Sequence, residues 1–215
     1  MNDYLECPHI CTCGSVTVTN STFSGNGADA GAGGIYGRCP VSVTNSIIAS
    51  SSGVNCDADI IDGGHNLQFP DTTCGETILS LDPKLDPAGL TDNGGPTQTL
   101  ALLPGSPAIN AGDPEVCAKP PVNGVDQRGY VRPGVGHAQC SIGAYEADAV
   151  PPPPCVGNCN GDGVVTIDEL ILGVNIVLEL RPVDACPAFA NSQGMVDIAQ
   201  LIKGVNNALG GCGSG

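Results

Sequence analysis

The chain has 215 residues, and its 22 acidic and 7 basic side chains give a formal net charge of −15 at pH 7. Nucleic-acid-binding proteins neutralise phosphates with Lys and Arg, so this charge excludes that class of protein. Gly and Pro are abundant, yet 41% of the residues are hydrophobic, too many for a disordered acidic chain. There is no run of eighteen apolar residues, so we expect no membrane span, and residues 1–10 lack the pattern of a signal peptide.

The twelve cysteines predict an extracellular or cell-surface protein with disulfide bonds, because cytosolic reductants would keep them as thiols. Without a recognisable signal peptide, we expect a mature or truncated chain. Near the N-terminus, soft metal ligands lie close together at Cys7, His9, Cys11 and Cys13. Their short spacing leaves little room for one tetrahedral shell, so disulfides of open pairing within residues 7–39 are the favoured interpretation.

A repeated strand pattern follows. The sequence VTVTNS at positions 16–21 recurs as VSVTNS at positions 41–46, and a shorter unit occupies positions 60–67. Val alternates with small hydroxyl residues at the period of a strand, and Gly-rich turns follow. Because no helical stretch separates the units, they predict successive rungs of a parallel β-helix, with an antiparallel sandwich as the alternative.

The alternation also predicts which side chains face the interior. We expect Val16, Val18, Val41 and Val43 to point inward, and Thr17, Thr19, Ser42 and Thr44 to face water. Asn20 and Asn45 would lie above one another at a corner, as a hydrogen-bonded ladder. The first rung should be an exposed edge unless upstream chain, another molecule or the loop of residues 7–13 covers it.

Four ordered motifs carry a family resemblance. They are residues 92–99 (DNGGPTQT), 102–112 (LLPGSPAINAG), 126–129 (DQRG) and 142–146 (IGAYE). Over roughly residues 13–147, the chain resembles secreted bacterial right-handed parallel β-helix proteins of the choice-of-anchor Q type. The resemblance implies an extracellular β-helix, an interchangeable C-terminal anchoring module and no agreed enzymatic activity. It also implies the disulfides Cys56–Cys74 and Cys117–Cys140.

The sequence assigns no catalytic residue, because neither G-x-S-x-G nor H-E-x-x-H occurs. Asp57, Asp59 and Asp62 are close in sequence, and β-helix lyases and glycosidases use clustered carboxylates on their outer face, but a solvated acidic loop is the more ordinary interpretation. We expect Asp126 and Arg128 to form a structural ion pair or to cap turns.

Four prolines, residues 151–154, predict a stiff linker between a β-helix at residues 1–150 and a small module at residues 155–215. The module opens with residues 158–169 (NCNGDGVVTIDE), which fit the EF-hand calcium loop with Asn in the first position. The ligands predicted for one calcium ion are Asn158, Asn160, Asp162, the carbonyl of Val164, Thr166 and the bidentate carboxylate of Glu169. The alternative is a plain turn before a helix with an acidic first turn.

A second copy of the module's pattern follows the first, and each copy predicts an amphipathic helix whose apolar stripe packs against the other. In the second loop the ligand positions hold Phe189, Asn191, Gln193 and Gln200, which cannot attract a divalent cation well. We therefore predict a metal-free structural copy, and one calcium ion in all.

Two EF-like repeats after a proline linker resemble a dockerin over residues 155–212. This implies attachment to a cohesin-bearing scaffold or a cell surface. The chain has Ile167 and Asp168 where cohesin-binding dockerins often carry small hydroxyl residues, so the partner stays open. Three disulfide pairings are open for the cysteines of the module, which are Cys155, Cys159, Cys186 and Cys212.

Together these features predict a mainly β chain, a short right-handed parallel β-helix followed by a small all-α calcium-binding module. We expect an extracellular structural or adhesive protein rather than an enzyme. One alternative is a fragment of a polysaccharide lyase or glycoside hydrolase, with carbohydrate as its ligand. The other is a fibre subunit that self-associates through open β-helix ends.

Overall fold

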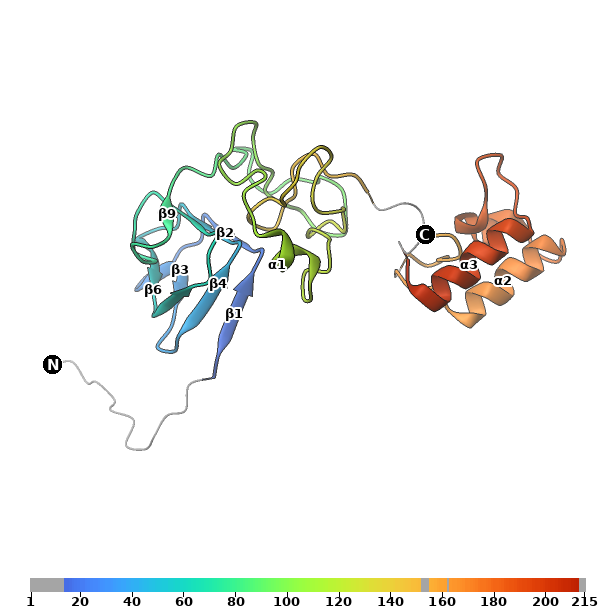
Figure 1. Cartoon of the computed structure of the whole chain (residues 1–215), viewed down its shortest axis with the longest axis horizontal. Helices are drawn as coiled ribbons and strands as arrows, with labels where there is room; N and C mark the ends of the chain where they lie inside the picture. The colour runs from blue at the N-terminus through green and yellow to red at the C-terminus, as the bar shows by residue number, and fades with distance from the viewer. Residues whose placement is uncertain (1–13, 152–154, 162, 213–215) are drawn as a thin grey trace. The chain divides into compact units, whose positions relative to one another are not determined.

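The computed structural model describes residues 14–151, 155–161 and 163–212. The chain divides into two compact units, Met1–Pro151 and Pro152–Gly215 (Figure 1). The cluster of Cys7, His9, Cys11 and Cys13 lies outside the described residues. None of the helices among the described residues is long and apolar enough to cross a membrane.

The first unit is rich in short strands. These are β1 (Val16–Thr19), β2 (Thr22–Ser24), β3 (Ala32–Tyr36), β4 (Val41–Thr44), β5 (Ile47–Ala49), β6 (Val54–Asp57), β7 (Ile60–Asp62), β8 (Leu67–Phe69) and β9 (Leu79–Ser80). They form three sheets with the orders β1-β4-β7, β2-β5-β8-β9 and β3-β6. The chain thus visits the three sheets in turn and then returns to the first. Every pair of these strands is parallel, so the antiparallel sandwich is wrong.

The pairing register matches the sequence repeat. Val16 pairs with Val41 and Thr19 with Thr44, which are equivalent positions of the two copies, and Val41 pairs in turn with Ile60. On β4, Val43 is fully buried, as a residue that alternates inward should be. Equivalent residues therefore lie above one another, and their inward side chains form a continuous apolar core.

Among the described residues, the first strand is an exposed edge of the stack, as the sequence predicts, and Val18 still packs against the core. Val16 is 50% exposed, and Val18 is only half-buried. Among the described residues, β1 pairs with β4 on one side and with no strand on the other. Val16 thus lacks the neighbour that covers Val41 in the next rung.

The segment after β9 has little regular structure apart from the short helix α1 (Pro114–Ala118). It returns to the first rungs, where Gly143 N donates to the carbonyl of Asn45 at 2.8 Å and Ala144 N donates to Thr22 Oγ1 at 3.0 Å. Both disulfides that the resemblance implied in this unit, Cys56–Cys74 and Cys117–Cys140, are formed. Cys39 is disulfide-bonded as well.

The second unit contains two helices, α2 (Ile167–Val177) and α3 (Ile198–Gly210), with the 3₁₀ turns η1 (Val183–Ala185) and η2 (Pro187–Phe189) between them. Its four cysteines pair as Cys155–Cys212 and Cys159–Cys186, which selects one of the three open pairings. Both bonds link distant parts of a small unit, so they reduce the conformational freedom of its unfolded chain.

The core of the second unit is built around Phe189, which is fully buried and packs with Ile176 and Leu201. Two glycines at equivalent repeat positions make room for its ring. A Cβ at Gly173 would lie 2.6 Å from Phe189 Cε2, and one at Gly204 would lie 2.7 Å from Phe189 Cε1. These distances are too short for any side chain, so both positions require glycine.

The apolar residues of the two helices are divided between the inside and the outside of the unit. Gly173 and Ile176 face the core, but Ile171, Val174 and Leu178 are exposed. The prediction that the whole apolar stripe of one helix packs against the other is therefore wrong. The two helices contact each other only through the sides that face Phe189.

Candidate functional site

The predicted calcium loop runs directly into α2. Thr166 is the N-cap of this helix and accepts a hydrogen bond from Glu169 N at 3.4 Å, while Glu169 Oε2 accepts one from Thr166 N at 2.8 Å. The other carboxylate oxygen, Oε1, accepts from Cys159 N at 2.8 Å and from Asn160 N at 3.2 Å. The carboxylate of Glu169 is thus turned back into the loop and joins its two ends.

The environment of this carboxylate favours its charged form. Burial raises the pKa of Glu169, but the hydrogen bonds from Thr166, Cys159 and Asn160 lower it by more, so the pKa lies below its usual value. The carboxylate also lies in the first turn of α2, where the helix dipole stabilises an anion.

The other predicted ligands, which are neutral apart from the carboxylate of Asp162, lie along the same loop. Asn158 Oδ1 accepts a hydrogen bond from Gly161 N at 2.9 Å, so this side chain shapes the turn. Gly163 has a φ of +85°, the left-handed conformation that the sharp turn of an EF-hand loop needs. Asp162 lies outside the described residues.

Two interpretations of the loop use the same residues. A capping box needs Thr166 and Glu169 in their observed positions, and an EF-hand loop needs a buried Glu169 directed at the loop. The described residues, which do not include Asp162, contain no group of three or more His, Cys, Asp or Glu side chains placed for a metal. Calcium binding by Asn158, Asn160, Asp162, Val164, Thr166 and Glu169 therefore stays a prediction.

The second loop uses its predicted ligand positions differently. Phe189 fills the core, and Asn191 Oδ1 accepts hydrogen bonds from Gln193 N at 2.9 Å and Met195 N at 3.1 Å, so it holds a turn. Asp197 is the N-cap of α3 and accepts from Gln200 N at 3.0 Å. Sequence reasoning missed the role of Phe189, although it is the only aromatic residue after the prolines.

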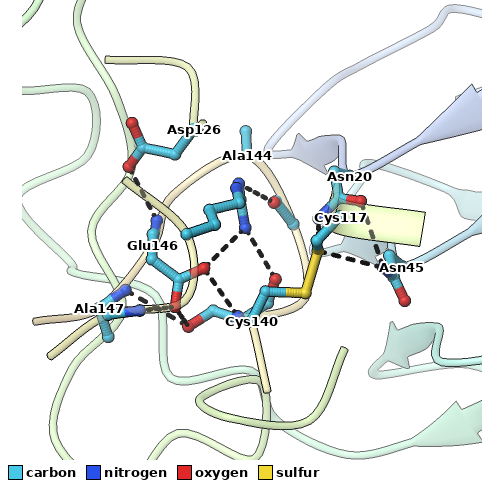
Figure 2. A network of polar contacts seen from close by, with 12 residues as sticks. Asn20, Asn45, Cys117, Asp126, Cys140, Ala144, Glu146 and Ala147 are labelled. Atoms are coloured by element: carbon cyan, nitrogen blue, oxygen red, sulfur yellow. Dashed lines mark hydrogen bonds and ion pairs between the residues drawn. A yellow bond between two sulfur atoms is a disulfide. The ribbon is translucent and has the colours of Figure 1, made fainter. Parts of the chain in front are cut away.

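The first unit holds a second candidate, a buried polar network (Figure 2). Glu146 is fully buried, and its carboxylate accepts hydrogen bonds from three residues. They come from Arg132 Nη1 at 3.0 Å, Ser141 N at 2.8 Å, Ser141 Oγ at 3.0 Å and Gly134 N at 3.1 Å. A buried carboxylate is costly unless it is paired in this way.

Arg132, the cationic partner of Glu146, completes the network. Its guanidinium also donates to the carbonyls of Ser141 at 2.9 Å, Gly143 at 2.7 Å and Val125 at 3.2 Å. Burial lowers the pKa of Arg132, and the charges of Glu146 and Asp126 oppose that effect without cancelling it. Sequence reasoning missed this ion pair, because the two residues are separated by a region without helical or strand periodicity.

Asp126 and Arg128 form the structural ion pair that the sequence predicted, at 2.7 Å and almost fully buried. The guanidinium lies 4.3 Å from the ring centre of Tyr130 and 3.8 Å from that of Tyr145, so it is stabilised by both aromatic faces. Asp126 Oδ2 accepts from Glu146 N at 3.0 Å. The DQRG and IGAYE motifs therefore meet in one closed network, which suits a structural role.

The asparagine ladder lies beside this network (Figure 2). Asn45 Nδ2 donates to Asn20 Oδ1 at 3.2 Å, and both residues are buried in the left-handed conformation, with φ of 50° and 45°. This confirms the predicted stack. Asn45 also holds α1, because its side chain accepts from Asp113 N at 2.9 Å and donates to the Asp113 carbonyl at 3.2 Å.

The acidic residues around β7 do not converge on one site. Asp62 Oδ1 accepts from Gly64 N at 2.9 Å and Asn66 Nδ2 at 2.7 Å, and so it shapes the turn after β7. Asp57 and Asp59 are exposed. This arrangement fits the solvated acidic turn better than paired catalytic carboxylates.

Comparison of the chain with family models, curated proteins and solved structures gave no match.

Proposed function

We propose that the chain is an extracellular structural or adhesive protein. In this proposal the first unit is a short right-handed parallel β-helix of the choice-of-anchor Q type, and the second is a dockerin-like attachment module stabilised by one calcium ion. The β-helix serves as a stalk. The module joins it to a cohesin-like or cell-surface scaffold protein.

The observation that carries this proposal is the stacking of equivalent residues from successive repeats. Val16, Val41 and Ile60 pair in register, and Asn20 and Asn45 share a hydrogen bond. Stacked rungs hold equivalent residues in contact and pair the backbone of each strand with the next, which suits a rigid structural element. The buried network of Glu146 and Arg132 adds rigidity without leaving a charged group open to a substrate.

The disulfides support the proposed compartment. Eight of the described cysteines form four disulfides, which persist where the surroundings are oxidising. In the second unit they stabilise a core that rests on a single aromatic side chain. Such a unit gains much from a bound ion that ties its loop together.

The position of Glu169 supports the calcium site. This carboxylate is buried, charged and directed into a loop that has the glycine and the oxygen-bearing residues of an EF-hand at the required spacing. An incoming calcium ion would replace hydrogen bonds from Cys159 N and Asn160 N, so the anion is already in place to bind it.

Differential scanning calorimetry of the full chain, with calcium and with a chelator, tests the attachment module. We expect two unfolding transitions, of which only that of the helical unit rises with calcium. At free calcium one hundred times the dissociation constant, the gain should be about 2.7 kcal/mol. Magnesium at the same concentration is the control, and an unchanged helical transition in calcium would contradict the proposal.

One observation favours self-assembly as a second candidate function. An open apolar hollow at the start of the stack is lined by Val16, Val18, Phe23, Ile35 and Tyr36 among others. Tyr36 is 65% exposed. In a fibre subunit, this end would pack against another stack, and Val16→Glu would then abolish growth of particle size with concentration.

A further inference from the structure

Helices α2 and α3 each carry an exposed apolar row on their outer side. The residues and their exposed fractions are Ile167 (75%), Ile171 (53%), Val174 (44%) and Leu178 (61%) on α2 and its C-cap, and Ile198 (68%), Ile202 (56%), Val205 (43%) and Leu209 (83%) on α3. We call these eight residues the outer face. Soluble monomers rarely expose so large a contiguous apolar patch.

The two rows lie on the same side of the helix pair. A Cβ at Gly173 would contact Leu201, and one at Gly204 would contact Leu170, so equivalent residues exchange partners across a local two-fold axis between antiparallel helices. Such an axis places equivalent positions of the two helices on one face. That face is opposite the buried residues Gly173 and Ile176, given about 100° of rotation per residue.

The spacing within each row is specific for helix packing. Successive residues of a row are four, three and four positions apart, which is the a/d spacing of a heptad seam. Such a seam packs best against another helix with the same spacing. In the described part of the second unit, α2 and α3 are the only α-helices, and both already use their inner sides to contact Phe189.

We propose that the outer face binds the outer face of a second copy of this chain, forming a two-fold symmetric four-helix interface. The chain supplies the partner that the seam requires, since two a/d rows on one copy meet two identical rows on the other. Eight aliphatic side chains that are 43–83% exposed offer on the order of 800 Å² per copy, the contribution of each partner to a standard-size interface.

The charge pattern agrees with this occupant. No residue of the outer face is charged, so it offers nothing to a charged partner, and burying it leaves no ion unpaired. The net charge of −15 makes two copies repel one another. Association should therefore strengthen as salt rises, because salt screens the repulsion and leaves the apolar contact intact.

This interface goes beyond the proposed function and needs only the folded helix pair. Because it covers Ile167, which lies at a cohesin-recognition position, a dimer and a scaffold-bound module are alternative states of the same surface. Sedimentation equilibrium of the full chain in saturating calcium tests it directly. We expect the mass of two chains at high protein concentration, and tighter association in high salt. A single-chain mass from micromolar to millimolar concentration, or association that weakens with salt, would overturn the proposal.

Variants locate the contact. Ile202→Glu enters a two-fold interface twice and should weaken association about 100-fold, because it buries like charges against each other. Leu180→Glu is the matched control, since Leu180 is 69% exposed but lies outside the outer face, and it should leave the dimer intact. Circular dichroism verifies the helices, and Ile171→Glu repeats the test on α2 if Ile202→Glu does not fold.

Val16→Glu separates this interface from one at the end of the strand stack. The dimer should persist in this variant, because Val16 belongs to the other unit. Loss of the dimer in Val16→Glu, or equal loss in Leu180→Glu and Ile202→Glu, would overturn the outer face as the contact.

Discussion

The two units use sequence repeats in opposite ways. In the first unit the repeats stack, so Val16 lies against Val41 and Asn20 against Asn45, each residue beside its own equivalent. In the second unit the two repeats face one another, so Gly173 and Gly204 lie on either side of one residue, Phe189.

The difference has a physical consequence for each unit. A stack can lengthen by adding rungs, but its first strand leaves Val16 half exposed. A two-fold pair closes on itself, but only one residue can occupy its centre. Phe189 occupies that centre, and it stands at a ligand position of the second loop. The two loops of the module are therefore unequal.

The largest expected effect tests the stack. Val43→Asp puts a charge without a partner into a fully buried position and should destabilise the first unit by more than about 4 kcal/mol. Thr44→Asp, at the next and only half-buried position, should destabilise the first unit far less. Urea unfolding measures both, and equal losses would mean that the inward and outward faces are assigned wrongly.

A slightly smaller effect tests the two-fold pair. Phe189→Ala leaves a cavity between Gly173 and Gly204 and should cost the second unit about 3–5 kcal/mol. Its calorimetric transition should fall while that of the first unit stays in place. Tyr36→Ala, which removes an aromatic ring that is 65% exposed, is the control and should have little effect.

The asparagine ladder is expected to contribute less. Asn45→Ala removes the hydrogen bonds to the buried Asn20 and the half-buried Asp113, a cost of about 1–3 kcal/mol. Asn26→Ala removes an exposed asparagine in the same region and should be nearly neutral. Chemical unfolding of the two variants compares them, and equal stability would show that the ladder does not hold α1.

The smallest effect is a pH dependence of the first unit. Burial raises the pKa of Asp71, but hydrogen bonds from Thr73 and Asn55 lower it by more, so the folded pKa lies below the unfolded value of about 3.9. The resulting stability is present above about pH 4 and is lost as the pH falls through the folded pKa. Asp71→Asn should remove that part of the acid sensitivity, which unfolding midpoints measured between about pH 7 and pH 2 would show.

Sequence reasoning works best where contacts are local or repeated. The period of two in VTVT and VSVT predicts strands, register and the Asn20–Asn45 pair, because each repeat meets its own copy. It fails at Glu146 and Arg132, whose pairing depends on an irregular segment folding back. Sequence reasoning also fails to separate the buried from the exposed apolar residues of the helices. Ile171 and Ile176 are the same residue type, but the first is exposed and the second is buried.

The inequality of the two loops is tested most directly by isothermal titration of calcium into the full chain. We expect one ion per chain, with a dissociation constant of about 10⁻⁴ to 10⁻³ M. Glu169→Gln should abolish binding yet keep α2, because Gln also completes a capping box, whereas Gln200→Ala should leave binding unchanged. Two ions per chain, no ion, or unchanged binding in Glu169→Gln would contradict the assignment of the metal to the first loop.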